Sequence, residues 1–172
     1  MAEITNQLEY DDDVAHQAVQ KLYDLLRGAD DRPWCLTVSF SHPHDPFVAR
    51  RSYRDLYADC AHLLPPGTPI AYDDQDAHSR RLMDSCDWRN FTITESHIRR
   101  ARRRYFANIS YIADKIGELL AVLDAIRQEA IAIFTSDHGE MLGERGLWFK
   151  MNFFEGSARV PLMIAAPGLT PA

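Results

Sequence analysis

The most informative stretch of this chain is Thr135-Ser136-Asp137-His138-Gly139-Glu140-Met141-Leu142-Gly143-Glu144-Arg145-Gly146-Leu147-Trp148-Phe149-Lys150. The apolar run 130–135 that leads into it is typical of a strand buried on both faces, as in a parallel sheet covered by helices. A carboxylate (Asp137), an imidazole (His138) and a lone ammonium group (Lys150) then follow, with three glycines between them. Such groups suit a divalent cation and a tetrahedral oxyanion held together.

Helices and strands alternate on either side of this stretch. Apolar residues at helical spacing predict the helices, and uncharged runs rich in β-formers predict the strands. The expected elements are helices over 11–28 and 94–127 and strands over 34–40, 130–135 and 160–166. Asp11, Asp12 and Asp13 are expected to cap the first helix, and Thr92 with Glu95 could form a capping box on the second. This alternation predicts an α/β domain.

Two further segments connect these elements. Ser41 to Phe47 follows the strand at 34–40 and contains two prolines, which predicts a rigid loop. His44 in this loop could donate to a bound oxyanion or protonate a leaving alkoxide, and we favour it over His42, which we expect to be structural or to line the rim of the site. The polar stretch 65–90 shows no period and is expected to be a long surface excursion.

Composition excludes several classes of protein. The net charge of −6 gives no reason to expect nucleic-acid binding. No apolar run is long enough to cross a membrane, and the start lacks the pattern of a signal peptide. Cys35, Cys60 and Cys86 lack disulfide or zinc spacing, so we expect reduced thiols in a cytoplasmic protein, with Cys35 in the core.

Two clusters of polar residues follow predicted strands, Ser41 to Phe47 and Ser136 to Lys150. In open α/β sheets ligands bind beyond the carboxyl ends of the strands, so we expect both clusters at one edge. Asp137 and His138 are candidate ligands of calcium, magnesium or manganese, with zinc admitted by the imidazole. Lys150 and His44 are candidates for contacting a sulfate or phosphate group. A surface turn and a surface lysine are the alternative interpretations.

Several motifs together resemble those of the sulfatases, in the alkaline-phosphatase superfamily. They comprise Asp137-His138-Gly139 through Lys150, Arg159-Val160-Pro161-Leu162, the helix around Arg103 to Tyr111, and Pro43-His44-Asp45-Pro46. The segments 5–12 and 145–157 are most similar to the choline-sulfatase branch of that family. The resemblance implies a partial catalytic domain over 1–172 with an alkaline-phosphatase-like, mixed and mostly parallel sheet flanked by helices. It also implies a calcium-type cation on Asp137 and His138, with His44 and Lys150 on the sulfate ester.

The family's nucleophile is missing from this sequence. Sulfatases convert a Cys or Ser in a Cys/Ser-x-Pro-x-Arg motif to formylglycine, and the 172 residues contain no such motif. The first acidic metal ligands are not found either, so we expect an internal fragment that is inactive alone. The resemblance implies a small-molecule sulfate ester, choline sulfate, as substrate. A phosphodiesterase or phosphonate monoester hydrolase, a non-catalytic metal- or anion-binding remnant, and a homo-oligomer all stay open.

Overall fold

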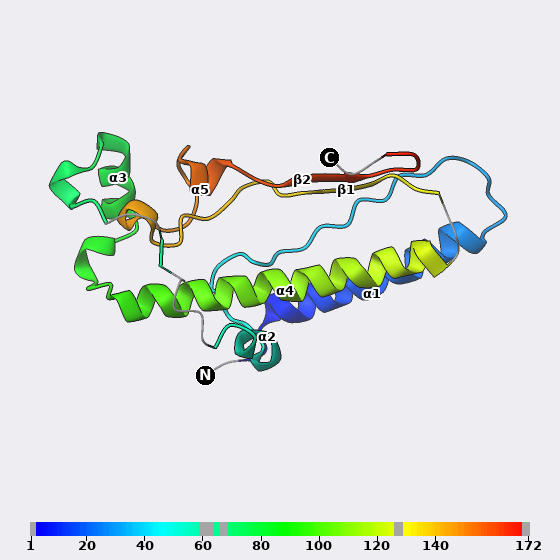
Figure 1. Ribbon diagram of the computed structural model, residues 1–172, viewed down its shortest axis with the longest axis horizontal. Coiled ribbons are helices and arrows are strands. Elements are labelled where there is room, and N and C mark those ends of the chain that lie inside the picture. The colour runs from blue at the N-terminus through cyan, green and yellow to red at the C-terminus, as the bar shows by residue number, and fades with distance from the viewer. Residues whose placement is uncertain (1–2, 59–63, 66–68, 126–128, 170–172) are drawn as a thin grey trace. The chain divides into compact units, whose positions relative to one another are not determined.

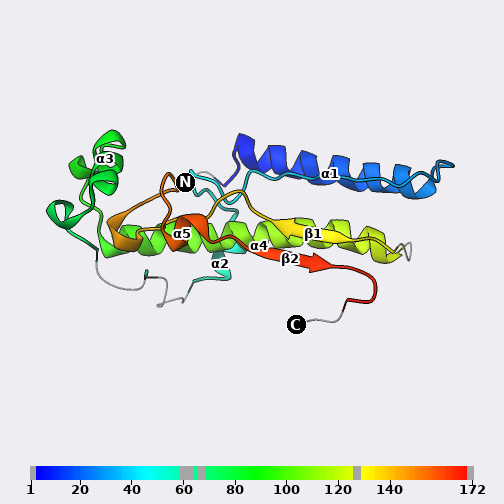
Figure 2. The ribbon, with the colours of Figure 1, turned by 90° about the horizontal axis from the view of Figure 1, so that it is seen from above.

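A computed structural model describes residues 3–58, 64–65, 69–125 and 129–169 (Figures 1 and 2). The chain divides into two compact units. The first comprises residues 1–58, 104–132 and 165–172, and the second comprises 59–103 and 133–164. Each unit therefore contains segments that are distant in the sequence. The predicted single partial domain over 1–172 stays a prediction.

Helix α1 (Asn6–Arg27) opens the first unit. Thr5 caps it by accepting a hydrogen bond from the amide of Leu8 (3.2 Å), and the helix ends at Gly28, as expected. The prediction that residues 11–13 cap this helix is wrong, because they lie inside it. Its buried face carries Leu8, Asp11, Ala15, Ala18 and Leu22, which recur at helical spacing.

Helix α4 (Glu95–Ala125) confirms the long helix predicted from about residue 94. Thr94 caps the amino end of this helix, because its hydroxyl oxygen accepts from the amide of His97 (3.4 Å). The cap is therefore Thr94 rather than the proposed capping box of Thr92 and Glu95. The second half of α4 runs beside α1 (Figures 1 and 2). Leu8, Tyr111 and Ile112 form the buried core there, packed by Phe40, Tyr53 and Ile116. Tyr53 comes from the short helix α2 (Arg51–Asp55).

The segment 34–40 is not a strand among the described residues. Its side chains alternate between half-buried (Leu36, Val38) and exposed (Thr37, Ser39), which is the period of extended backbone. A strand also needs a hydrogen-bonded neighbour, and β-propensity in the sequence cannot supply one. Cys35 is exposed, so the expectation that it lies in the core is wrong, although Cys35 and Cys86 are both free thiols. Cys60 lies outside the described residues.

The described sheet has two strands, β1 (Ala132–Thr135) and β2 (Leu162–Ala165), which run antiparallel (Figure 1). Their positions confirm both predicted strands, but no parallel pairing occurs in the described part. Burial on both faces is also wrong, because Ile133 is 65% exposed. An apolar run indicates which side chains would gain from burial, whereas burial itself depends on the layers that cover them. The whole of β2 is exposed as well.

The predicted excursion over 65–90, which shows no period in the sequence, contains regular structure among its described residues. It forms 3₁₀ turns η1 (Tyr72–Asp74) and η2 (Trp88–Asn90) around helix α3 (Ala77–Ser85). Asp76 caps α3 by accepting from the amides of His78 and Ser79, both at 3.0 Å. The second unit is completed by η3 (Glu144–Gly146) and α5 (Glu155–Ala158).

Candidate functional site

The loop that follows β1 is held by backbone hydrogen bonds to the start of α5. The amide of Gly139 donates to the carbonyl of Ser157, and the amide of Glu140 donates to the carbonyl of Gly156, both at 2.7 Å. A Cβ atom on Gly139 would lie 2.2 Å from the Gly156 carbonyl oxygen. Only glycine permits this close approach, so Gly139 fixes the path of the chain immediately after His138.

The side chain of Glu140 holds the two ends of the loop together. Its Oε1 accepts from the amides of Leu142 (3.2 Å) and Phe149 (2.5 Å). The amide of Met141 also donates to the carbonyl of Phe149 (2.9 Å). Lys150, the residue after Phe149, therefore lies near the residues that follow His138.

The same loop concentrates unusual backbone conformations. Leu142, Arg145 and Phe149 all have positive φ, at 48°, 59° and 64°. L-residues in this left-handed region cost roughly 1 to 2 kcal/mol each, and such strain is concentrated at functional sites. The loop is therefore maintained by its surroundings rather than by local preference.

Asp137 and His138 lie side by side with the chemistry of metal ligands. His138 Nδ1 lies 2.9 Å from the carbonyl oxygen of Gly139. Because a carbonyl can only accept, Nδ1 carries a proton, and Nε2 has the lone pair of the neutral ring. That Nε2 lies 3.8 Å from Oδ2 of Asp137, whose side chain is 88% exposed. Two neighbouring ligands of one cation are separated by roughly 3.0 to 3.9 Å, given metal–ligand distances of about 2.1 to 2.4 Å and octahedral or tetrahedral angles.

This pair fits part of a coordination shell. The 3.8 Å separation and the tautomer of His138 suit one shared cation. The described residues contain no group of three or more His, Cys, Asp or Glu side chains that could hold a metal. Asp137 and His138 would therefore contribute two ligands to a divalent cation, and further ligands would have to come from elsewhere.

Residues of the segment 69–90 contact this loop and hold it in place. Gln75, which is buried, donates from Nε2 to the carbonyl of Arg145 (2.7 Å). The ring nitrogen Nε2 of His78 lies 2.9 Å from the carbonyl oxygen of Met151 and donates to it. Trp88 lies against the ring of Phe149, with 5.9 Å between ring centroids. These contacts hold the positions on both sides of Lys150, which is itself half-buried.

Arg102 in the first turns of α4 supports the loop as well. Its Nη1 donates to the carbonyl of Leu142 (3.2 Å). Burial lowers the pKa of Arg102, while the negative charge of Glu144 acts in the opposite direction. Arg99, on the same helix, instead pairs with Glu95 (2.5 Å).

The first unit builds the loop that carries His44. Asp11 of α1 is fully buried and accepts from the Ser41 amide (2.7 Å), the Ser41 hydroxyl (3.1 Å) and the His42 amide (2.9 Å). His42 Nδ1 lies 2.6 Å from the same carboxylate. Burial alone would raise the pKa of Asp11, but the hydrogen bonds from His42 and Ser41 outweigh it and keep the pKa below its ordinary value. His42 is therefore structural, as expected.

His44 lies at the exposed tip of that loop, with 42% of its side chain accessible. Its Nδ1 is 2.8 Å from the carbonyl oxygen of Asp45 and donates to it. Gln7 of α1 donates to the same carbonyl (3.2 Å). This contact fixes the orientation of the imidazole and places its proton on Nδ1.

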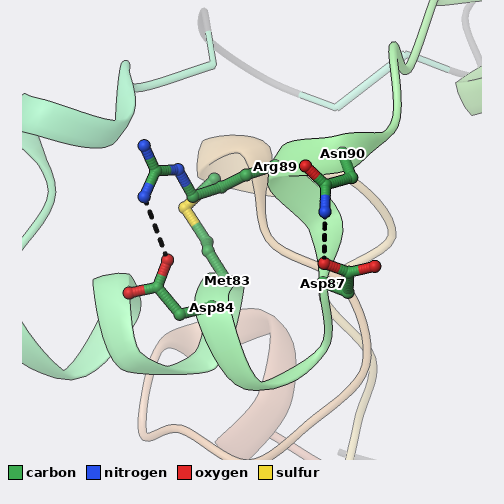
Figure 3. Close-up of a pocket in the computed structure, with 5 residues that line it drawn as sticks. All are labelled: Met83, Asp84, Asp87, Arg89 and Asn90. Atoms are coloured by element: carbon green, nitrogen blue, oxygen red, sulfur yellow. Dashed lines mark hydrogen bonds and ion pairs between the residues drawn. The ribbon is translucent and has the colours of Figure 1, made fainter.

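The second unit also has a polar recess, lined by Met83, Asp84, Asp87, Arg89 and Asn90 (Figure 3). Its volume is about 280 Å³. Arg89 pairs with Asp84 (3.4 Å), and Asn90 donates to Asp87 (2.7 Å). Its charged groups are therefore engaged with one another, and none of the predicted site residues lines it.

The sequence-predicted site residues fall into two groups. Asp137, His138 and Lys150 belong to one loop of the second unit, and His44 belongs to the first unit. Their predicted meeting at one sheet edge stays a prediction. Sequence reasoning missed Asp11 and Gln75. For Asp11 a signal existed, because it occupies the same helical face as the apolar residues of α1.

Comparison with known sequences gives a consistent result. The family model described as Sulfatase matches residues 3–172. The chain is 64% identical to the choline-sulfatase of Rhizobium meliloti (strain 1021), over 99% of this chain and 34% of that protein. It is 33% identical to the iduronate 2-sulfatase of Mus musculus, over 90% of this chain and 30% of that protein. The chain thus spans about a third of the length of these relatives.

Solved structures give the same assignment of the fold. A phosphonate monoester hydrolase from Silicibacter pomeroyi superposes with a TM-score of 0.75 and 28% identity, over 92% of this chain and 33% of that one. The phosphonate monoester hydrolase of Agrobacterium radiobacter superposes with a TM-score of 0.58 and 25% identity, over 88% and 33%. The predicted alkaline-phosphatase-like α/β class is confirmed.

Proposed function

Because this chain belongs to the sulfatase family, we propose that it forms part of a sulfate-ester hydrolase whose substrate is choline sulfate. The observation that carries the proposal is the 64% identity to a choline-sulfatase along nearly the whole chain. The 3.8 Å approach of Asp137 and His138 supports it independently, because these are ligands of the kind that the reaction needs.

Asp137 and His138 would hold a divalent cation, calcium by the resemblance, with magnesium or manganese as alternatives. When bound, such a cation polarises the sulfate oxygens and stabilises negative charge. The carboxylate of Asp137 suits a hard cation, and the Gly139 carbonyl keeps the lone pair of His138 on Nε2.

Lys150 and His44 would contact the sulfate group. The ammonium of Lys150 supplies a positive charge for sulfate oxygens, and Glu140 fixes the backbone just before it. His44 would act through Nε2, because its Nδ1–H is engaged by the Asp45 carbonyl. In its protonated form Nε2–H could donate to the leaving oxygen.

The family's formylglycine has no precursor motif in these 172 residues. We therefore expect the chain by itself to bind ligands without hydrolysing sulfate esters. Location in the cytoplasm is part of the proposal and is supported by the free thiols Cys35 and Cys86. No helix in the described part of the chain is long and apolar enough to span a membrane.

Hydrolysis of phosphonate monoesters is the second candidate. It is favoured by the superposition, at a TM-score of 0.75, on the phosphonate monoester hydrolase of Silicibacter pomeroyi. The two activities would use the same cation and the same Lys150. A binding preference for sulfate over methylphosphonate, or the reverse, would separate them.

The test is a binding titration of the chain with inorganic sulfate, choline sulfate and methylphosphonate in the presence of calcium. Lys150→Ala should weaken sulfate binding by about tenfold or more, since a charge-assisted hydrogen bond contributes about 1.5 to 3 kcal/mol. Lys21→Ala, which removes an exposed lysine of α1, is the matched control. Equal binding by the wild type and Lys150→Ala would contradict the role of Lys150. Preference for methylphosphonate would favour the second candidate.

A further inference from the structure

We propose that Gln7 and Asp11 of α1 form a clamp that positions the imidazole of His44 for contact with the oxyanion. The inference rests on the proposed function of His44. It concerns two residues that neither contact the sulfate nor bind the metal in the proposal above.

The clamp grips the His44 loop at two points. Gln7 and Asp11 are four residues apart, so they lie on the same face of α1, one turn from each other. Asp11 engages the beginning of the loop through Ser41 and His42. Gln7 engages it on the other side of His44, at the carbonyl of Asp45. His44 therefore lies between two segments of the loop that are each hydrogen-bonded to α1.

Asp11 makes the stronger of the two contacts. Its carboxylate accepts four hydrogen bonds, two from Ser41 and two from His42. The side chains of Asp11 and His42 are both fully inaccessible to solvent. A buried carboxylate on a helix face that is otherwise apolar is costly unless it is fully paired. Here the four hydrogen bonds offset that cost, and they also fix the backbone two residues before His44.

Gln7 acts on the ring more directly. The Asp45 carbonyl accepts from Gln7 Nε2 at 3.2 Å and from His44 Nδ1 at 2.8 Å. One oxygen atom thus links the helix to the imidazole. By holding that oxygen, Gln7 fixes the side of the ring on which Nδ1 lies and therefore the orientation of the imidazole.

The test uses the isolated chain with Asp11→Asn, and with Asp13→Asn as the matched control. Asp13 is exposed on the same helix and undergoes the same change of charge. In Asp11→Asn an amide NH₂ replaces one acceptor, so at least one loop donor loses its partner. The Ser41 and His42 amides should exchange hydrogen about tenfold faster or more, relative to the amide of Ala18. Losing one charge-assisted hydrogen bond lowers the free energy of opening by about 1.5 kcal/mol or more, which corresponds to at least a tenfold change in rate.

The second readout is binding of inorganic sulfate, followed through the imidazole resonances of His44 by NMR. Asp11→Asn should weaken the sulfate affinity reported by His44 by about tenfold to a hundredfold, because small misplacements of a positioned group have effects of this size. Asp13→Asn should match the wild type. If Asp11→Asn does not fold, Gln7→Ala removes the single hydrogen bond to Asp45 and should give the same pattern with smaller amplitude.

The outcomes separate the clamp from the proposed function. Loop amides that stay as protected in Asp11→Asn as in the wild type would overturn the clamp. Released amides with unchanged sulfate affinity would show a structural contact and overturn the positioning role. If His44 in the wild type does not respond to sulfate, the proposed contact of His44 fails and the positioning role fails with it, whereas the amide measurement still reports on the clamp.

Discussion

Gly139→Ala tests the link between the proposed metal ligands, Asp137 and His138, and α5. The new methyl group would lie 2.2 Å from the Gly156 carbonyl oxygen and 3.3 Å from the Ser157 carbonyl oxygen. Both are backbone atoms, so no side chain can rotate away to make room. The two segments must separate, and the hydrogen bonds from the Gly139 and Glu140 amides, each 2.7 Å long, must lengthen or break.

The expected loss follows from these two effects. Two backbone hydrogen bonds contribute about 1 kcal/mol each, and inserting a methyl group into a filled space costs about 1 to 3 kcal/mol. The free energy of unfolding should therefore fall by roughly 3 to 5 kcal/mol. The carbonyl of Gly139 also orients His138, so the variant should lose cation affinity as well.

The assay is urea unfolding followed by tryptophan fluorescence, to which the buried Trp148 contributes. Gly117→Ala is the control, because a Cβ there meets no atom within 4 Å inside helix α4. It should stabilise the chain by about 0.5 to 1 kcal/mol, since alanine is the better helix former. If Gly139→Ala unfolded at the same urea concentration as the wild type, the close approach of the two segments would be wrong.

Three further predictions concern the chain by itself. It should not turn over an aryl sulfate, because the sequence has no nucleophile motif, and turnover that Lys150→Ala abolishes would contradict this. It should associate in size-exclusion chromatography through the exposed strand residues, of which Ile133 is 65% and Leu162 67% exposed; Ile133→Lys should reduce association, and Leu120→Lys on α4 should not, whereas a monomeric wild type would count against the idea. The pKa of Asp76 is lowered to about 2 by hydrogen bonds from Ser79, so its stabilising effect is complete above the ordinary value of 3.8 and is lost as the pH falls from there toward 2. Urea midpoints across that range should fall less in Asp76→Asn than in the wild type, and equal falls would refute the coupling.

Local patterns in the sequence predicted the two long helices, whereas the short helices α2, α3 and α5 were not predicted. The apolar stripe of α4 and the glycine after α1 are local signals, and both agree with the structure. The strand positions β1 and β2 were also predicted. Burial and pairing were not, because a strand's partners and covering layers are set by segments far away in the chain. Ile133 shows this limit, as does the segment 34–40, which has no strand partner among the described residues.

The candidate site was predicted in part for the same reason. Asp137, His138 and Lys150 occur in one continuous motif, so sequence alone could place them in one loop. The hydrogen bonds from Gln75 and His78 to the loop join residues about seventy positions apart in the sequence. The segment that carries them shows no helical period, although it forms α3. Asp11 was misread as a helix cap because a run of three aspartates resembles one. Only its register with Leu8 and Ala15 indicates a buried role.

The most direct test of the central claim is paramagnetic broadening of the histidine imidazole resonances by Mn²⁺. If Asp137 and His138 share a cation and His44 belongs to the same site, His138 and His44 should both broaden at substoichiometric Mn²⁺. Calcium should reverse the effect, and Asp137→Asn should abolish it for both rings. Broadening of His138 with a His44 signal that stays sharp would contradict the shared site, and no broadening of His138 would contradict the metal site itself.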